Sequence, residues 1–327
     1  MRQFSQGLVL VLAVTTAMSH QAAAQGTGDS TDASVIAMIN QQIEQSWADN
    51  EFKPSPPAPE GKWVRRVFLD VLGRIPTHVE TTKFLANKDE DKREQLINEL
   101  LSEEYELEFA RNWTTVWTNI LIGRSGGNDP ERPVNRKGLQ KYLRDSFLRH
   151  KPYDKMAFEL ISATGMNKPG EAGFNGAVNF LLDNLQDDQV PATNKVSRIF
   201  LGLRVGCTQC HNHPFNEWKQ DQFWSFNAFF KQAKPLRTFG EGQDILMAEL
   251  QDEDFGGQDG NFEQAALFYQ QRNGLTKVAY PRFVDGTKID PVGIVSETNR
   301  RMELAKLVQN SPNAAQAMVN RVWGQYM

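Results

Sequence analysis

The chain has only two cysteines, and both lie in one pentapeptide, Cys207-Thr208-Gln209-Cys210-His211. A disulfide therefore cannot join distant segments of this chain, and a fold of 327 residues must depend on the packing of apolar side chains. The same pentapeptide has the C-x-x-C-H spacing at which a c-type haem is attached. Two intervening residues let both sulfur atoms reach one edge of a porphyrin, and the adjacent His211 becomes the proximal ligand of the iron.

Three kinds of site are compatible with this pentad. In the first, Cys207 and Cys210 form thioether bonds to haem c and His211 binds the iron. In the second, Cys207, Cys210, His211 and His213 hold zinc or iron without haem. Four ligands so close in sequence are crowded around one ion, so a carboxylate such as Glu217 could replace one of them. In the third, the two thiols form a redox or structural disulfide. The sequence leaves all three open.

The sequence does not clearly indicate the second ligand of a haem iron or the apolar residues that would surround the porphyrin. His213 is too close to His211 to reach the opposite face of the same iron, and four other candidates for that position have no characteristic spacing: His78, His150, Met166 and Met247. Seven aromatic residues follow the pentad, and they either line a cofactor or form an ordinary core: Phe215, Trp218, Phe223, Trp224, Phe226, Phe229 and Phe230.

The N-terminal 24 residues are typical of a secretory signal peptide. Arg2 supplies the positive start, Leu8–Val14 form a short apolar core, and Ala22-Ala23-Ala24 is a small-residue cleavage site. The apolar run is shorter than the roughly 20 residues that a membrane-spanning helix needs. We therefore predict an exported protein of the periplasm or cell envelope, with no transmembrane anchor after cleavage.

Composition narrows the classes of partner. The 40 acidic side chains outnumber the 36 basic ones, and the sequence has no basic stripe, which argues against nucleic acid as a partner. No nucleophile elbow, phosphate-binding loop or zincin helix is recognisable, so the sequence neither predicts nor excludes an enzyme. Electron transfer would require a periplasmic redox partner. The oligomeric state is not predicted.

The apolar periodicity is mostly helical. We predict helices at about 34–48, 61–72, 103–122, 135–149 and 153–163. Helix starts are predicted at Thr77 with Glu80, at Asp91 with Glu94, at Asp154 and at Pro191, and a final helix is predicted from about Glu297. We expect residues 165–188 to run over the surface, and we find no sustained strand alternation. The predicted fold is mainly α, a multi-helix globular domain with long irregular loops.

Several stretches resemble a known family. Three of them, within residues 35–235, are RRVFLDVLGRIPT (65–77), DKREQLINELLSEEYELEFARNW (91–113) and RIFLGLRVGCTQCHNHPFNEWKQDQFWSFNAFF (198–230). They resemble a planctomycete-type, cytochrome-c-associated domain of unknown function. Three later stretches resemble the start of its usual partner domain: PRFVDG (281–286), NRRMELAKLV (299–308) and MVNRVWGQYM (318–327).

The resemblance implies a fold, export and a haem or metal site at Cys207–His213, but no reaction. Members of this family usually continue further, so the C-terminal part is expected to be incomplete. The predicted organisation is a signal peptide (1–24), an N-terminal helix with a Pro-rich linker (25–60), a helical domain with the pentad (61–235), an acidic Gly-rich insertion (236–280) and a truncated second domain (281–327).

Two functions are expected from these observations. The first is electron transfer or redox support in the periplasm by a haem- or metal-binding protein. The alternative is a non-catalytic structural or binding protein of the cell envelope, in which the Cys/His site holds zinc or iron.

Overall fold

The computed structural model describes residues 28–127, 132–241 and 245–326. The predicted signal peptide, residues 1–24, lies outside the described residues. The chain divides into two compact units, Met1–Ala58 and Pro59–Met327. In the first unit, α1 (Gly28–Asp49) precedes a Pro-rich segment without helix or strand, as the sequence predicts. None of the described helices is long and apolar enough to cross a membrane.

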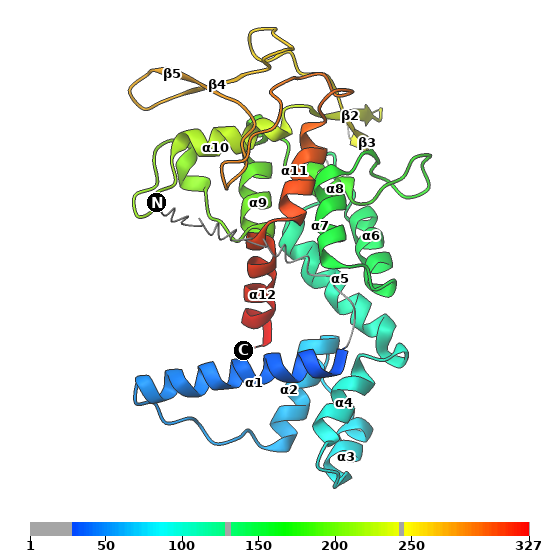
Figure 1. Ribbon diagram of the computed structural model, residues 1–327. Coiled ribbons are helices and arrows are strands. Elements are labelled where there is room, and N and C mark those ends of the chain that lie inside the picture. The colour runs from blue at the N-terminus through cyan, green and yellow to red at the C-terminus, as the bar shows by residue number, and fades with distance from the viewer. Residues whose placement is uncertain (1–27, 128–131, 242–244, 327) are drawn as a thin grey trace, which may run out of the picture. The chain divides into compact units, whose positions relative to one another are not determined.

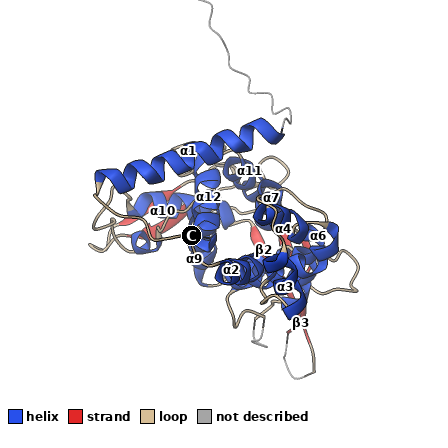
Figure 2. Cartoon of the chain, turned by 90° about the horizontal axis from the view of Figure 1, so that it is seen from below, coloured by secondary structure: helices blue, strands red, loops and turns tan. Residues whose placement is uncertain are grey.

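The second unit is mainly α, which confirms the predicted fold class (Figures 1 and 2). Its helices are α2 (Glu60–Leu72), α3 (His78–Ala86), α4 (Lys92–Leu100), α5 (Glu106–Ile122), α6 (Arg136–Leu148), α7 (Tyr153–Ser162), α8 (Val178–Leu182), α9 (Val190–Phe200), α10 (Gln220–Asn227), α11 (Arg300–Gln309) and α12 (Pro312–Tyr326).

The described residues also form five short strands. Three form an antiparallel sheet in the order β1-β3-β2, and two form a hairpin: β1 (Gly165–Met166), β2 (Ala233–Phe239), β3 (Ile245–Asp252), β4 (Leu267–Gln270) and β5 (Thr276–Ala279). These strands are short, and the sequence shows no sustained alternation that would have predicted them. In β3, Ala248 and Leu250 point to the core, and Leu246 is exposed. These three residues share one face of the strand, but only Ala248 and Leu250 are buried, so the strand offers just two buried positions in alternation.

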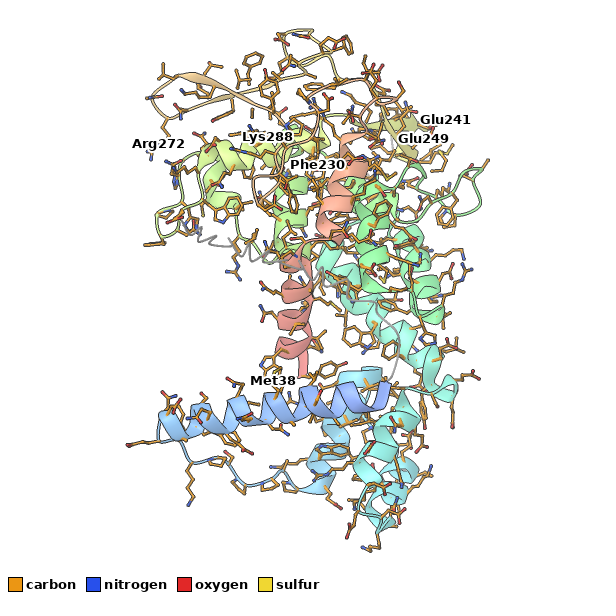
Figure 3. All side chains as sticks on the ribbon, in the orientation of Figure 1. Met38, Phe230, Glu241, Glu249, Arg272 and Lys288 are labelled. Carbon is orange, nitrogen blue, oxygen red and sulfur yellow. The ribbon has the colours of Figure 1, made fainter. Side chains whose placement is uncertain are left out.

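The described residues of the second unit form two apolar cores and a small third cluster, in which Ala228 packs with Leu267, Tyr269 and Ala279. The smaller core joins α2, α3 and α4 through Val64, Phe68, Phe84 and other residues. The larger one gathers apolar side chains from α5 to α9 and α11, together with Phe230, which Figure 3 labels. The tryptophans of α5 serve this core, as predicted: Trp117 is buried and Trp113 packs against it.

Residues 165–188 do not run over the surface as expected, because their centre is buried. Val178, Phe180 and Leu181 of α8 are fully buried in the larger core. The buried Asn179 provides the polar partners that this segment needs: its Oδ1 accepts from the Asn135 backbone N–H at 2.7 Å, and its Nδ2 donates to the Asn167 carbonyl at 3.0 Å. The polar residues of this segment thus satisfy buried backbone groups instead of marking a surface loop.

Two of the predicted helix starts are confirmed. Thr77 and Glu80 form a complete capping box: the Glu80 N–H donates to Thr77 Oγ1 at 3.2 Å, and the Thr77 N–H donates to Glu80 Oε2 at 2.6 Å. Pro191 lies in the first turn of α9, where its missing N–H costs no helical hydrogen bond.

Three other predictions about helix ends hold only in part. α4 begins directly after Asp91, as predicted, but Asp91 Oδ1 accepts from Gln95 Nε2 instead of capping the helix. α7 begins at Tyr153, as predicted, but Asp154 lies inside it and its carboxylate accepts from Gln309 Nε2. The single C-terminal helix expected from Glu297 is two helices, α11 and α12, divided at Pro312. Proline cannot continue a helix because it lacks the N–H and clashes with the preceding turn.

Residues on both sides of position 280 belong to one compact unit. Phe283, Leu304 and Val308 lie in the same core as α7 and α9. The boundary at 280/281 is predicted from the resemblance of the two segments to two different family domains. It stays a prediction.

Candidate functional site

The pentad lies between α9 and α10 (Figure 1): Cys207, Thr208 and Gln209 belong to a 3₁₀ turn, Gly206–Gln209, and Cys210 and His211 follow it. Thr208 is fully buried, and its hydroxyl donates to the Val205 carbonyl at 2.6 Å. The Gln209 carbonyl accepts two hydrogen bonds from α10, from Gln220 Nε2 and Trp224 Nε1, both at 3.0 Å. The middle of the pentad is thus anchored to α10 while its ends are free for other contacts.

The residues that follow the pentad are also fixed. The Gln220 N–H donates to Asn212 Oδ1 at 3.1 Å, and the His213 N–H donates to the Trp218 carbonyl at 2.7 Å. Trp224 stacks on Tyr269 of β4, with ring centroids 5.9 Å apart. The backbone around the two histidines is therefore positioned by α10 and the β4–β5 hairpin.

Both thiols of the pentad are free and exposed. His211 Nδ1 lies 2.6 Å from the Asn212 carbonyl oxygen. A carbonyl oxygen can only accept, so this contact requires the proton of a neutral His211 to be on Nδ1. The Nε2 lone pair is then available for a metal ion, in the arrangement by which backbone carbonyls commonly orient metal-binding imidazoles.

His213 has the opposite tautomer when neutral. Its Nδ1 accepts from the Phe215 backbone N–H at 3.2 Å. A neutral His213 therefore has its proton on Nε2, and neither nitrogen offers a free lone pair without loss of that contact. The two histidines, equivalent candidates in the sequence, differ in the structure: His211 is suited to bind a metal and His213 is not.

The four predicted ligands do not converge. Among the described residues, no three Cys, His, Asp or Glu side chains form a group that could hold a metal ion. Cys207 lies in the 3₁₀ turn, Cys210 and His211 follow it directly, and His213 and Glu217 belong to the loop beyond. A haem fits this donor set in part, since it needs two accessible thiols and one imidazole and brings the other ligands of the iron itself.

The aromatic residues do not enclose the pentad. Phe223, Phe226, Phe229 and Phe230 are buried, and the last three belong to the larger core. Phe215, the first of the run, is 92% exposed. The four buried phenylalanines therefore form an ordinary core and do not supply the predicted wall for a porphyrin.

The structure does not single out a second ligand for the iron. His150 Nε2 lies 3.5 Å from Glu106 Oε1, and His78 begins α3. Met166 and Met247 lie on β1 and β3 of the three-stranded sheet. None of these four side chains is placed in the pentad turn or in the helices that anchor it.

A groove beside Cys207 was missed by the sequence analysis. Its volume is about 670 Å³, and we call it the α9 groove; it is lined by Pro191, Asn194, Lys195, Arg198, Arg204, Val205, Gly206 and Cys207. Pro191, Asn194, Lys195 and Arg198 have the spacing of one face of a helix. That spacing can be read from the sequence, but the position of Arg204 beside this helix face cannot, so the sequence contains only part of the signal for the groove.

Lys195 is the most enclosed cation of the groove. Its Nζ donates to the Leu121 carbonyl at 3.3 Å, and its pKa is lowered, mainly by burial and then by the charge of Arg198. Gly206 brings the pentad close to α9: a Cβ atom there would lie 3.1 Å from Asn194 Oδ1, closer than most side-chain contacts. The absence of a side chain at 206 thus lets the turn pack against this helix.

The start of α9 is fixed by an unusual turn. Asp187, Asp188 and Gln189 all have left-handed backbone angles, with φ between 51° and 61°, which are uncommon for residues other than glycine. Buried Lys231 holds this turn by donating to the Asp188 carbonyl at 3.1 Å and to Gln189 Oε1 at 2.6 Å, and Asn227 Nδ2 donates to the same carbonyl at 2.9 Å. These contacts fix where α9, and with it one wall of the groove, begins.

Comparison with known proteins identifies the family. No curated protein and no solved structure matches the chain. The sequence model of one family, PSCyt2, described as a protein of unknown function (DUF1549), matches residues 38–235, a segment that includes the pentad and the α9 groove. Since this match covers more than half of the chain, the protein belongs to the PSCyt2 (DUF1549) family.

Proposed function

We propose that the protein carries a covalent haem c on Cys207 and Cys210, with His211 as the axial ligand, and that it transfers electrons or supports a redox process in the periplasm or cell envelope. The observation that carries the proposal is the pentad itself: two free, exposed thiols flank a segment anchored to α10 and are followed by an imidazole whose Nε2 can bind iron. When bound, the haem would supply one-electron chemistry.

The surroundings of the pentad favour electron transfer over chemistry in a closed pocket. The thiols are exposed, and the nearby phenylalanines belong to the core. Solvent exposure is one of the properties that set the potential of a haem. The proposal includes export through the N-terminal signal, a periplasmic redox partner, an association with cytochrome c modules, and residues 281–327 as the start of the partner domain that the sequence resembles.

The first test is expression with the signal peptide in a host that matures c-type cytochromes, followed by intact mass and the reduced pyridine-adduct spectrum. We expect a haem-sized mass increment and a c-type band. The Cys207→Ser/Cys210→Ser variant should lose the covalent haem completely, because no thioether can form.

The two histidines provide a matched pair of variants. We expect His211→Ala to change the haem spectrum by loss of the axial ligand, and His213→Ala to leave it unchanged. A parent protein without haem that instead contains one equivalent of zinc or iron, lost in both histidine variants, would refute the proposal. That result would support a fold-stabilising metal site in a cell-envelope protein.

A further inference from the structure

We propose that the α9 groove is a binding site for an organic carboxylate with an apolar body. This inference goes beyond haem attachment and does not depend on it. The carboxylate can come from two sources: the propionate groups of a haem held on Cys207, or a free organic acid. The groove chemistry is the same in both cases.

The charge of the groove is the first argument. Lys195, Arg198 and Arg204 line it, and its described lining includes no carboxylate. Among the described residues, neither the Arg198 nor the Arg204 guanidinium group has a hydrogen-bond or ion-pair partner. The guanidinium group of arginine matches the two oxygens of a carboxylate, so unpaired arginines beside a groove form a recognition site for this group.

Repulsion within the groove is the second argument. The charge of Arg198 lowers the pKa of Lys195, so the two cations act on each other. The carboxylate of Asp183 opposes this effect on Lys195, although burial disfavours its own charged form. A bound anion would relieve the repulsion among the three cations and would be held by all of them.

The apolar lining is the third argument. Pro191 and Val205 line the groove together with the aliphatic stems of its long cationic side chains. The volume of about 670 Å³ lies within the range usual for sites that take small organic molecules. A small inorganic anion would use the charges but leave the apolar surface in water. An acid with a ring-sized apolar body uses both.

The test uses the full chain in its haem-free, reduced form and isothermal titration calorimetry. The probe is 1-naphthoate, with uncharged 1-naphthylmethanol and acetate as the two half-ligands. We expect saturable binding of 1-naphthoate and weaker binding of both half-ligands. In Arg198→Gln/Arg204→Gln, the affinity for 1-naphthoate should fall by about tenfold or more, the effect of losing charge-assisted hydrogen bonds.

Arg272→Gln provides the matched control. Arg272 is an exposed arginine in the β4–β5 hairpin, away from the groove lining (Figure 3), and its removal should leave the affinity unchanged. Absence of saturable binding to the haem-free chain would overturn the proposal. So would a loss in the double variant no greater than in Arg272→Gln.

The haem-loaded chain distinguishes the two sources of carboxylate. If 1-naphthoate binds the haem-free chain but not the haem-loaded chain, the propionates occupy the groove. Equal binding to both forms identifies a free organic acid as the ligand. Either result supports the groove as a carboxylate site. Absence of haem from the parent protein would refute haem attachment but would leave the binding test on the haem-free chain valid.

Discussion

Asp183 is a buried carboxylate whose charge the surrounding protein only partly compensates. Its side chain is 6% exposed, and Arg132 Nη1 lies 3.5 Å from Oδ1. Burial raises the pKa of Asp183 to about 6, and the charges of Arg132 and Lys195 oppose this increase without cancelling it. The ionised carboxylate is therefore less stable in the folded chain than in water.

This shift predicts a specific dependence of stability on pH. An aspartate in an unfolded chain has a pKa near 3.9, so between roughly pH 4 and 6 the folded protein binds more protons at this site than the unfolded protein. The contribution of Asp183 to the free energy of unfolding must fall as pH rises through this window, by about 3 kcal/mol for a shift of two pKa units.

We expect Asp183→Asn to remove this dependence, because the amide has no charge to desolvate. Relative to the parent, the variant should gain roughly 1–3 kcal/mol between pH 4.5 and pH 7.5. Urea unfolding at the two pH values measures the gain. Asp145→Asn, at an exposed pair with Lys141, is the control and should change little. An equal dependence on pH in Asp183→Asn and the parent would contradict the argument.

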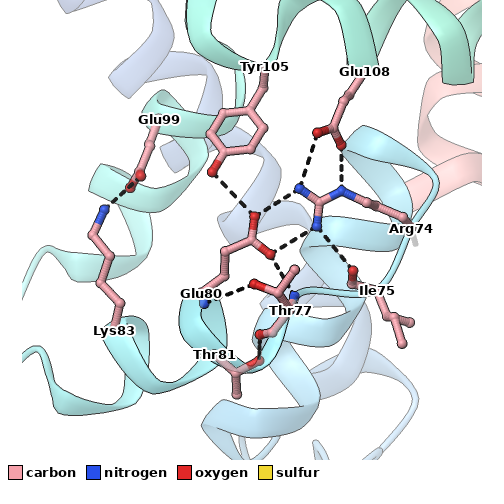
Figure 4. Close-up of polar contacts among 9 residues, drawn as sticks. All are labelled: Arg74, Ile75, Thr77, Glu80, Thr81, Lys83, Glu99, Tyr105 and Glu108. Atoms are coloured by element: carbon pink, nitrogen blue, oxygen red, sulfur yellow. Dashed lines mark hydrogen bonds and ion pairs between the residues drawn. The ribbon is translucent and has the colours of Figure 1, made fainter.

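At the level of single elements, Glu80 connects the start of α3 to two other segments (Figure 4). Its carboxylate completes the capping box with Thr77, accepts two hydrogen bonds from the Arg74 guanidinium at 2.8 and 2.9 Å, and receives a longer contact from the Tyr105 hydroxyl. The Arg74 contacts come first among the causes that lower the pKa of Glu80 to about 2. Arg74 also pairs with Glu108 of α5.

We expect Glu80→Gln to weaken this junction. The amide oxygen can still accept from the Thr77 N–H, but the charge opposite Arg74 is lost, and the free energy of unfolding should fall by about 1–2 kcal/mol near neutral pH. Because the folded pKa of Glu80 is lowered, its stabilisation is present above the unfolded pKa of about 4.3 and is lost as pH falls toward 2.

The difference between Glu80→Gln and the parent should therefore shrink below pH 4, as measured by denaturant unfolding across pH. Glu99→Gln removes an ion pair with the exposed Lys83 and should cost no more than about 0.5 kcal/mol. Equal effects of these two variants would show that the Glu80 network adds nothing beyond an ordinary surface pair.

The same elements show which interactions can be predicted from a sequence. The capping box at Thr77 depends on residues three apart, so its pattern is local and was predicted correctly. Strand β3 could not be recognised, because its partners are β2 and β1, the latter some 80 residues away. The burial of Phe180 depends on a similar long-range polar network at Asn179.

The candidate site also combines local features that the sequence predicts with contacts that only the structure shows. The spacing of Cys207, Cys210 and His211 is local, and it keeps all three in or directly after one short 3₁₀ turn. The difference between His211 and His213 depends on which carbonyl or N–H each ring meets, and no residue pattern encodes it. The α9 groove needs Arg204 to lie beside α9, which only the folded chain shows.

In the second unit as a whole, the buried Arg300 and Arg301 join the C-terminal segment, residues 281–327, to the preceding residues. Arg300 donates to the carbonyls of Ala265 and Pro291 at 2.9 and 2.7 Å, with no carboxylate partner in the described residues, and burial lowers its pKa to about 10. Arg301 forms a 2.7 Å ion pair with Asp252 of β3, in which the two side chains are 0% and 5% exposed. Its Nη1 also donates to the carbonyls of Ile161 and Ala163.

Arg301 thus links α11, β3 and the end of α7, and its removal tests whether residues 281–327 fold with the preceding domain. A buried charge left without its partner destabilises a protein by about 3–5 kcal/mol, so we expect losses of this order for Arg301→Met and for Asp252→Asn. The double variant should lose clearly less than the sum, because it leaves no unpaired buried charge.

Urea unfolding of the four proteins measures this coupling, and the exposed pair Lys141–Asp145 provides a control cycle in which the losses should be small and additive. Each variant should also unfold in one transition, shifted as a whole, because Asp252 and Arg301 lie on opposite sides of the predicted boundary at 280/281. Two separate transitions, with only one shifted by Asp252→Asn, would mean that the C-terminal segment folds as a module of its own despite the ion pair.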